Sequence, residues 1–341
     1  LAYTRIDVLN PLSALPDLDD LNLTGVVNSD PSRLAVLVDH TDPEASLSRK
    51  ITTKDGTTFL VEDDTSLVLS AGKWAWQRLT LGEGVDADES FTLALNPATH
   101  VLSVTAFGRT DPFDLRGYHN GDGTYALQVV FDGGNGNDAL ALDGTFPLAL
   151  YAAGGAGDDD LAAAATTTYL FGGTGSDTLR TGSGTAILTG GNGDDTYVFA
   201  GDWGDATVNE NPGGGSDTLD FSAVSADLTL NLRGISTDGT NTVAHRANTI
   251  EGVIGGSGDD LLRFHRANGG VLELGEGTLT WDGTAVTHAG VEGIDVRFVD
   301  GSGERTGSVR VVADQDFSGL DLRMEAAALA VQASITAGGL S

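Results

Sequence analysis

The nine residues from Gly172 to Arg180 decide the fold of this chain, because close copies of their sequence GGTGSDTLR recur on both sides. Gly154–Ala162 reads GGAGDDDLA and Gly190–Val198 reads GGNGDDTYV, so three successive copies start 18 residues apart. Gly133–Ala141, GGNGNDALA, starts 21 residues earlier, which is the same interval with three residues inserted. The shared pattern is G-G-x-G-x-D-x-U-x, where U is large and apolar. Such a nonapeptide repeat predicts a parallel β-roll.

Each position of the repeat has a mechanical reason. Glycine permits the positive φ angles and close backbone approach that a tight turn needs. The eighth-position side chains are expected in the core of the roll: Leu140, Leu161, Leu179, Tyr197, Leu219 and Leu262. Eighteen residues make one full turn of two nonapeptides. The intervening nonapeptides, 163–171 and 181–189, lack the glycine–aspartate pattern but end in strand-like residues, so only one edge of the roll carries ion-binding turns.

The sixth-position aspartates point to a metal ion. They are Asp138, Asp159, Asp177 and Asp195, and two further copies at 213–219 and 255–263 add Asp217 and Asp260. Stacked turns would bring neighbouring carboxylates within about 5 Å, one strand spacing, where they repel each other and their pKa values rise. A hard dication relieves that repulsion. Calcium accepts six to eight oxygens in flexible geometry and magnesium demands a stricter octahedron, so the pattern predicts Ca²⁺.

Simpler interpretations apply to some of these residues. A flexible linker would explain the glycines, but linkers do not place aspartate and leucine at fixed offsets. The remaining acidic residues of the turns are interpreted as solvated surface: Asp158, Asp160, Asp194 and Asp259.

This array resembles the RTX (repeats-in-toxin) calcium β-roll of secreted bacterial proteins, over roughly residues 130–263. The resemblance implies about three or more Ca²⁺ ions, in the gaps between the turns that start at 133, 154, 172 and 190. It also implies ligands from the four aspartates at 138, 159, 177 and 195 and from backbone carbonyls of the turns: Asn135, Gly136, Ala156, Gly157, Thr174, Gly175, Asn192 and Gly193. The stretch 203–262 is also similar to segments of giant repetitive surface proteins of aquatic bacteria.

The rest of the chain is also predicted to be β-structure, which makes the fold class all-β. Residues 1–128 have short apolar runs between turn signals, so we expect a β-sandwich-like domain with an extended N-terminal arm. Residues 129–263 form the roll, with an insertion at about 220–254. Residues 264–341 are expected to continue as a solenoid or to form a hairpin cap. Within them, 322–333 is compatible with a short helix and equally with a strand.

Composition limits the function. The chain has 49 acidic and 18 basic residues among 341, a net charge of −31, which argues against a nucleic-acid partner. No apolar run is long enough for a transmembrane helix. Cysteine is absent, and neither His-Glu-x-x-His nor Gly-x-Ser-x-Gly occurs, so we expect no enzyme.

Two functions are compatible with these features. The first is a calcium-dependent extracellular structural protein at a bacterial surface, a segment or subunit of a surface layer, filament or adhesin stalk. Its partners would be copies of itself or adjoining segments of a longer chain. The alternative is an adhesin module that binds glycans or a surface through Trp74 and Trp76, mounted on the calcium roll.

Overall fold

The computed structural model describes residues 20–22, 35–38, 49–52, 58–61, 65–70 and 88–340, the last range with gaps at 107, 165, 212–213, 232–233, 247–248, 267–270, 276–277, 282–283, 292, 299–304, 307, 312–314, 327 and 332–334. These residues belong to two compact units, Leu1–Asp195 and Thr196–Ser341. Apart from one 3₁₀ turn, Arg116–Tyr118, the regular structure of the described residues is β-strand. None of their helices is long and apolar enough to span a membrane.

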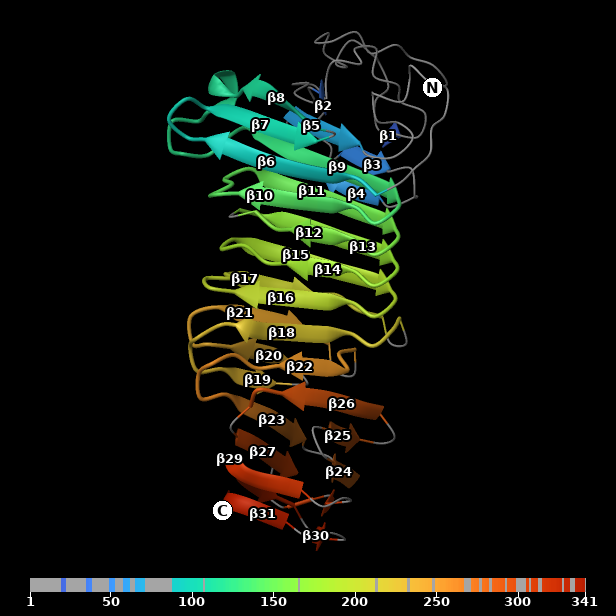
Figure 1. The fold of residues 1–341 in the computed structure, drawn as a ribbon, viewed down its shortest axis with the longest axis vertical. Coiled ribbons are helices and arrows are strands. Elements are labelled where there is room, and N and C mark those ends of the chain that lie inside the picture. Colours follow the sequence, from blue (N-terminus) through green and yellow to red (C-terminus); the bar gives the residue numbers. More distant parts are fainter. Residues whose placement is uncertain are drawn as a thin grey trace. The chain divides into compact units, whose positions relative to one another are not determined.

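The first unit contains two long sheets, which we name by one strand of each (Figure 1). The β9 sheet has the order β2 (Ala35–Val38), β5 (Thr65–Ser70), β9 (Leu127–Asn135), β11 (Ala149–Ala156), β13 (Thr168–Thr174) and β15 (Thr185–Asn192). The β10 sheet has the order β14 (Thr178–Arg180), β12 (Asp160–Ala162), β10 (Ala139–Asp143), β6 (Ser90–Asn96), β7 (Val101–Ala106) and β8 (Arg109–Asp114). From β5 to β15 and from β6 to β14 the neighbouring strands are parallel, as a roll requires.

The 18-residue interval appears directly in the strand register. Tyr169 of β13 pairs with Ile187 of β15, and Leu161 of β12 pairs with Leu179 of β14. Side chains alternate along each strand, so one face of each sheet lines the core. Leu170 of β13 is fully buried, as are Leu161 and Leu179 of the other sheet. All six eighth-position side chains named above are at most 1% exposed, which confirms that they lie in the core.

In the four turns that start at 133, 154, 172 and 190, two glycines each have backbone angles that other residues rarely adopt. In the turn from β13 to β14, φ is 126° at Gly173 and 122° at Gly175. A Cβ atom on Gly173 would also overlap the carbonyl oxygen of Gly155 in the preceding turn. The glycines at the second and fourth positions of the repeat therefore allow each turn to close and neighbouring turns to stack.

The N-terminal region contributes strands to the roll. Most of residues 1–87 lie outside the described part; of the predicted arm at 1–23 only 20–22 are described, and the tryptophans Trp74 and Trp76 are not. A three-stranded sheet joins β1 (Asp20–Asn22), β3 (Arg49–Thr52) and β4 (Thr58–Val61). Strands β5 and β6, within the region predicted as a sandwich, pair in parallel with β9 and β10. The two sheets of the roll thus include strands on the N-terminal side of residue 128.

The second unit also has two long sheets. The β23 sheet has the order β17 (Asp205–Val208), β21 (Thr242–His245), β20 (Ile235–Thr237), β19 (Thr229–Asn231), β23 (Leu261–Arg266), β27 (Gly293–Phe298), β29 (Gln315–Glu325) and β31 (Ile335–Leu340). The β22 sheet has the order β16 (Thr196–Ala200), β18 (Thr218–Ala223), β22 (Gly252–Ile254), β26 (Thr284–Ala289), β25 (Thr278–Trp281), β24 (Val271–Gly275), β28 (Ser308–Val311) and β30 (Ala328–Val331).

Antiparallel strands interrupt this roll at two places. Strands β19, β20 and β21, within the stretch 220–254 that was predicted as an insertion, pair antiparallel, as do β24, β25 and β26. Parallel pairing then continues through β27, β29 and β31 and through β28 and β30. The stretch 322–333, compatible with helix or strand by sequence, contains the end of β29 and all of β30.

The glycine turns generate a stability prediction. Gly173→Ala should lower the free energy of unfolding by more than about 2 kcal/mol, because the positive φ costs about 1–2 kcal/mol and the new Cβ overlaps a backbone carbonyl. Gly121→Ala is the control: its φ is 81°, but nothing lies within 4 Å of the new Cβ. Urea unfolding of both variants measures the difference, and equal losses would show that the close approach contributes nothing.

Candidate metal sites

A row of aspartates runs along the turn edge of the first unit. We call the sixth-position residues Asp138, Asp159, Asp177 and Asp195 the carboxylate ladder; each is at most 2% exposed. The backbone N–H of Asp138 donates to Oδ1 of Asp159 (2.7 Å), that of Asp159 to Asp177 (2.8 Å), and that of Asp177 to Asp195 (2.8 Å). Each carboxylate thus reaches back to the preceding turn, and the four predicted metal-binding aspartates form one continuous series.

The clearest indication of a cation site is at Asp177. Its Oδ1 accepts the amide bond from Asp159, but its Oδ2 is buried and accepts no hydrogen bond. A Cβ on Gly172 would overlap this oxygen, so the first glycine of the repeat leaves room for it. A buried carboxylate oxygen without a hydrogen bond is costly unless a cation or a proton neutralises it.

The electrostatics of Asp177 agree with this geometry. Burial raises the pKa of its carboxyl group from 3.8 to about 6, the amide of Asp159 opposes the rise, and the charge of Asp158 adds to it. Burial therefore makes the ionised form of Asp177 less stable than an exposed carboxylate, and a positive partner would offset that cost. Carboxylate and carbonyl oxygens are the donors that calcium prefers, so this donor set fits Ca²⁺.

The carbonyls predicted as ligands lie in one row on this edge. Strand register aligns Asn135, Ala156, Thr174 and Asn192. The carbonyl oxygens of Ala156, Thr174 and Asn192 accept hydrogen bonds of 2.8–2.9 Å from the fourth-position glycines of the preceding turns, Gly136, Gly157 and Gly175. Gly193 occupies the same position in the last turn and has a φ of 124°. A carbonyl oxygen has a second lone pair, so these bonds leave each oxygen with acceptor capacity.

Glutamates continue the ladder where the glycine motif is absent. The N–H of Glu89 donates to Oδ1 of Asp138 (2.9 Å), and Glu89 is 3% exposed. In the second unit the N–H of Asp217 donates to Oε2 of Glu251 (3.1 Å). Sequence analysis missed both glutamates. The available signal was a carboxylate two residues before a large apolar residue, as in Glu89-Ser-Phe91 and Glu251-Gly-Val253.

Asp260 has a different environment from Asp177. Its Oδ1 accepts the N–H of Leu228 (2.9 Å) and its Oδ2 accepts the N–H of Gly256 (2.5 Å). The copy at 255–263 therefore stacks on residues 224–228, a turn without glycine that the sequence did not reveal. Both oxygens of Asp260 are hydrogen-bonded, so its need for a cation is smaller.

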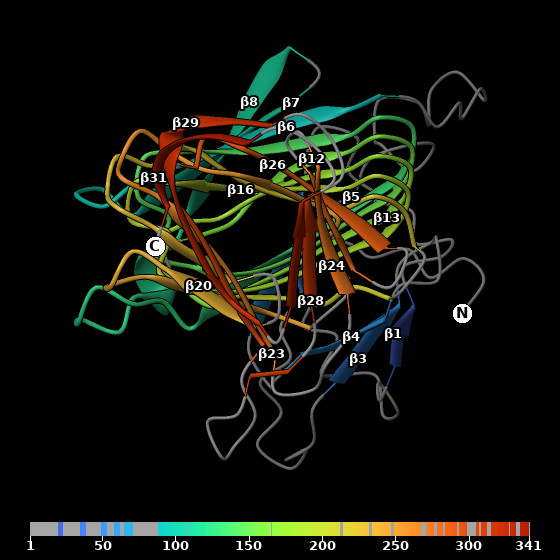
Figure 2. The ribbon, with the colours of Figure 1, turned by 90° about the horizontal axis from the view of Figure 1, so that it is seen from below.

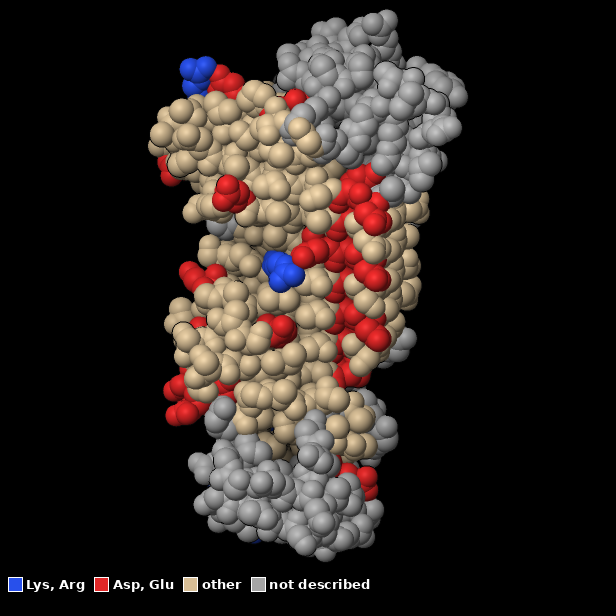
Figure 3. All heavy atoms as spheres, viewed as in Figure 1, with Lys and Arg blue, Asp and Glu red and all other residues tan. Residues whose placement is uncertain are grey.

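A second, exposed series of side chains stabilises the same turns. Asp158 Oδ1 accepts the N–H of Ser176 (2.7 Å), and Asn137 Oδ1 accepts the N–H of Asp158 (2.8 Å). These fifth-position side chains bond the following turn, whereas the ladder aspartates bond the preceding one. Asp158, Asp160, Asp194 and Asp259 are all exposed, and Figure 3 shows acidic side chains gathered along the turn edge. The fifth position thus cross-links turns as well as adding surface charge.

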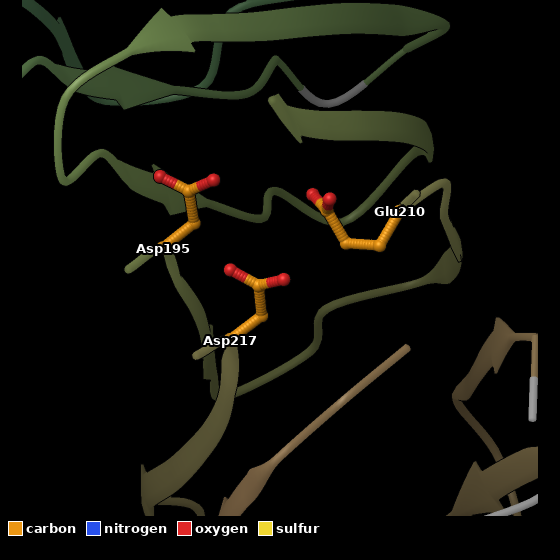
Figure 4. Close-up of side chains that lie close together, drawn as sticks. All are labelled: Asp195, Glu210 and Asp217. Carbon is orange, nitrogen blue, oxygen red and sulfur yellow. The ribbon is translucent and has the colours of Figure 1, made fainter. Parts of the chain in front are cut away.

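The second unit contains a pair of buried acidic side chains. Carboxylate oxygens of Glu210 and Asp217 lie within 4.8 Å of each other, and the residues are 3% and 1% exposed. The hydroxyl of Tyr197 donates to Glu210 Oε1. Figure 4, which also draws Asp195 of the first unit, shows both side chains turned toward the same space. Glu210 was not predicted from the sequence, because it lies in a loop seven residues before Asp217 and outside the repeat.

The pKa of Asp177 predicts an unusual pH dependence. In chelator, lowering the pH from 7 to 5 should increase the β-structure content, because the folded state holds this proton more tightly than the unfolded state, whose carboxyl group has the ordinary pKa of 3.8. The gain is complete below about pH 4 and is lost as the pH rises through about 6. In excess calcium the sign should reverse, since protons then compete with the ion.

Far-UV circular dichroism of the chain and of Asp177→Asn measures this effect. In chelator the variant should respond less to acid, because the asparagine side chain does not titrate. Identical pH profiles for the two proteins would contradict the assignment.

Comparisons with protein-family models, with curated proteins and with solved structures gave no match. The turn edge of the first unit combines a row of buried carboxylates, glycines that leave room beside them, and carbonyls in register.

Proposed function

We propose that this chain is a calcium-dependent structural protein of the RTX type, whose roll acts as a segment or subunit of an extracellular bacterial surface assembly. The observation that carries the proposal is Asp177, a buried carboxylate with one oxygen lacking any hydrogen bond and with its pKa raised to about 6. The same position recurs in the turns before and after it.

Calcium would act on folding rather than on a substrate. At an extracellular-type Kd of about 10⁻⁴ M and millimolar free calcium, one site stabilises the folded state by about 1.4 kcal/mol. Three such sites contribute several kcal/mol, comparable with the net stability of a domain. At cytosolic calcium the gain vanishes and the buried carboxylates destabilise the roll. The roll would thus remain unfolded inside the cell and fold outside.

Other features support an extracellular structural role. The chain has no cysteine, so metal ions would take the place of disulfides as the restraint that stabilises a secreted protein. The described residues form extended sheets. The alternative, a glycan-binding adhesin, depended on Trp74 and Trp76, which lie outside the described residues.

A calcium titration with two matched variants tests the proposal. Asp177→Asn and Asp158→Asn each remove one charge and keep the oxygen that accepts the amide of the adjacent turn. Asp177→Asn should weaken calcium binding by about tenfold or more, because affinity follows the charge of the ligands. Asp158→Asn, exposed, should change it by less than about twofold. Calorimetry measures affinity and circular dichroism measures folding.

Two results would overturn the calcium assignment. One is full β-structure in excess chelator at pH 7 with no heat on adding calcium. The other is an equal loss of affinity in both variants, which would assign the effect to net surface charge.

A further inference from the structure

An exposed loop of the first unit contains the dipeptide Asn120-Gly121. The loop follows β8 and the 3₁₀ turn Arg116–Tyr118 and leads into β9, and Figure 2 shows β8 beside β7, its partner in the β10 sheet. Asn120 and Gly121 are both exposed, and φ at Gly121 is 81°. In an Asn-Gly pair the backbone nitrogen of the glycine can attack the asparagine side chain easily, because glycine has no side chain to block the approach.

The backbone nitrogen of Gly121 has an imidazole as its hydrogen-bond partner. Its N–H donates to Nδ1 of His119 (3.2 Å). Only a ring nitrogen without a proton accepts such a bond, so the lone pair of Nδ1 faces the proton that has to leave. A general base must lie within about 2.6–3.2 Å of the atom whose proton it takes, and His119 meets that condition.

Two neighbouring rings hold this imidazole in place. The ring centroids of His119 and His100 are 4.3 Å apart, and Tyr125 packs against His119 in a T-shaped arrangement at 5.1 Å. Nδ1 of His100 and the hydroxyl of Tyr125 are hydrogen-bonded to each other (2.8 Å), so these two neighbours are themselves fixed. The backbones of His119 and Tyr125 form a β-bridge. The fold therefore positions the base beside Gly121.

The side chain of Asn120 also has a defined place in the loop. Its Nδ2 donates to Oγ1 of Thr124 (3.0 Å), and its backbone N–H donates to the carbonyl oxygen of Thr124 (3.0 Å). The Thr124 hydroxyl donates in turn to Oδ1 of Asp122 (2.5 Å). Release of the Asn120 side-chain nitrogen would thus break a single exposed hydrogen bond among the described residues.

A second Asn-Gly pair provides a comparison within the same unit. Asn135 is exposed, as Asn120 is, but the N–H of Gly136 donates to the carbonyl oxygen of Ala156 (2.8 Å). A carbonyl oxygen is a far weaker base than imidazole. The stacked turns also hold φ of Gly136 at 113°. Of these two pairs, only the one in the loop has a base at its glycine nitrogen.

We propose that Asn120 is a site of spontaneous deamidation, for which His119 is the general base. The nitrogen of Gly121 gives its proton to Nδ1 of His119 and forms a bond to Cγ of Asn120. The Cγ–Nδ2 bond breaks, and the side-chain nitrogen takes the proton from the imidazolium and leaves as ammonia. A cyclic imide remains, which water opens to aspartate or isoaspartate.

No atom is oxidised or reduced in this sequence, and water is the only co-reactant. The product adds a negative charge to a loop that already contains Asp122. The inference goes beyond the proposed structural function and does not depend on calcium binding.

Peptide mapping by mass spectrometry tests the inference on the whole chain, incubated folded at neutral pH in millimolar calcium. Deamidation at Asn120 should be faster than at Asn135 by about tenfold or more, since general-base catalysis contributes about 10²–10⁴-fold. His119→Gln is the decisive variant, because the glutamine amide oxygen can accept an N–H but is not a base. It should slow the reaction at Asn120 by about tenfold or more and leave Asn135 unchanged.

His100→Gln is the matched control, because it removes the adjacent imidazole and keeps Nδ1 of His119 beside Gly121. It should retain most of the rate at Asn120. In urea, which abolishes the loop geometry, the unaltered chain and His119→Gln should react equally at Asn120. Circular dichroism shows whether each variant is folded, and the comparison of Asn120 with Asn135 in the unaltered chain needs no variant.

Three results would overturn the inference. The first is an equal rate at Asn120 in the folded unaltered chain and in folded His119→Gln. The second is equal slowing by both histidine variants, which would assign the effect to loop packing. The third is an equal rate at Asn120 and Asn135 in the folded unaltered chain.

Discussion

The arrangement of this protein depends on placing carboxylates where water does not reach them. Each ladder aspartate after the first contributes one oxygen to the amide of the preceding turn, and at Asp177 the other oxygen faces the Cα of Gly172. The hydrogen bond fixes the spacing of the turns, and burial makes the charge unfavourable. The two effects oppose each other, and in the proposed calcium-bound state a cation would offset the cost of burial, so that the same feature of the turns would also control folding.

The fold of the repeat region could be predicted because its rules are local. Glycine at positions that need positive φ, aspartate at a fixed offset and leucine two residues later all appear in the sequence, and the structure has the expected 18-residue register. The ladder elsewhere could not be predicted in the same way. The turn at Glu89 contributes the N–H that bonds Asp138, and the turn at Glu251 contributes the carboxylate that accepts the N–H of Asp217, but neither has the repeat's G-G-x-G pattern, so no motif marks it.

The candidate site also combines residues that the sequence predicted with residues that it did not. Asp177 was identified from its spacing, whereas the pairing of Asp260 with Leu228 depends on a turn at 224–228 that has no recognisable sequence pattern. Glu210 approaches Asp217 through a loop whose path only the tertiary structure defines. Repetition makes contacts between equivalent positions predictable, and loops bring together residues that no repeat relates.

The carboxylate ladder tolerates very different lengths of chain between its successive members. Its amide-to-carboxylate bonds join residues 18 apart at Asp159 and Asp177, 21 apart at Asp138 and Asp159, and 49 apart at Glu89 and Asp138. Extra residues are accommodated away from the ladder: Leu140 aligns with Leu161 and Leu150 with Thr168, so the first of these two intervals is ten residues long and the second is seven. Such a molecule can acquire new surface loops in evolution, or receive grafted peptides by design, without disturbing the spine on which its coils are stacked.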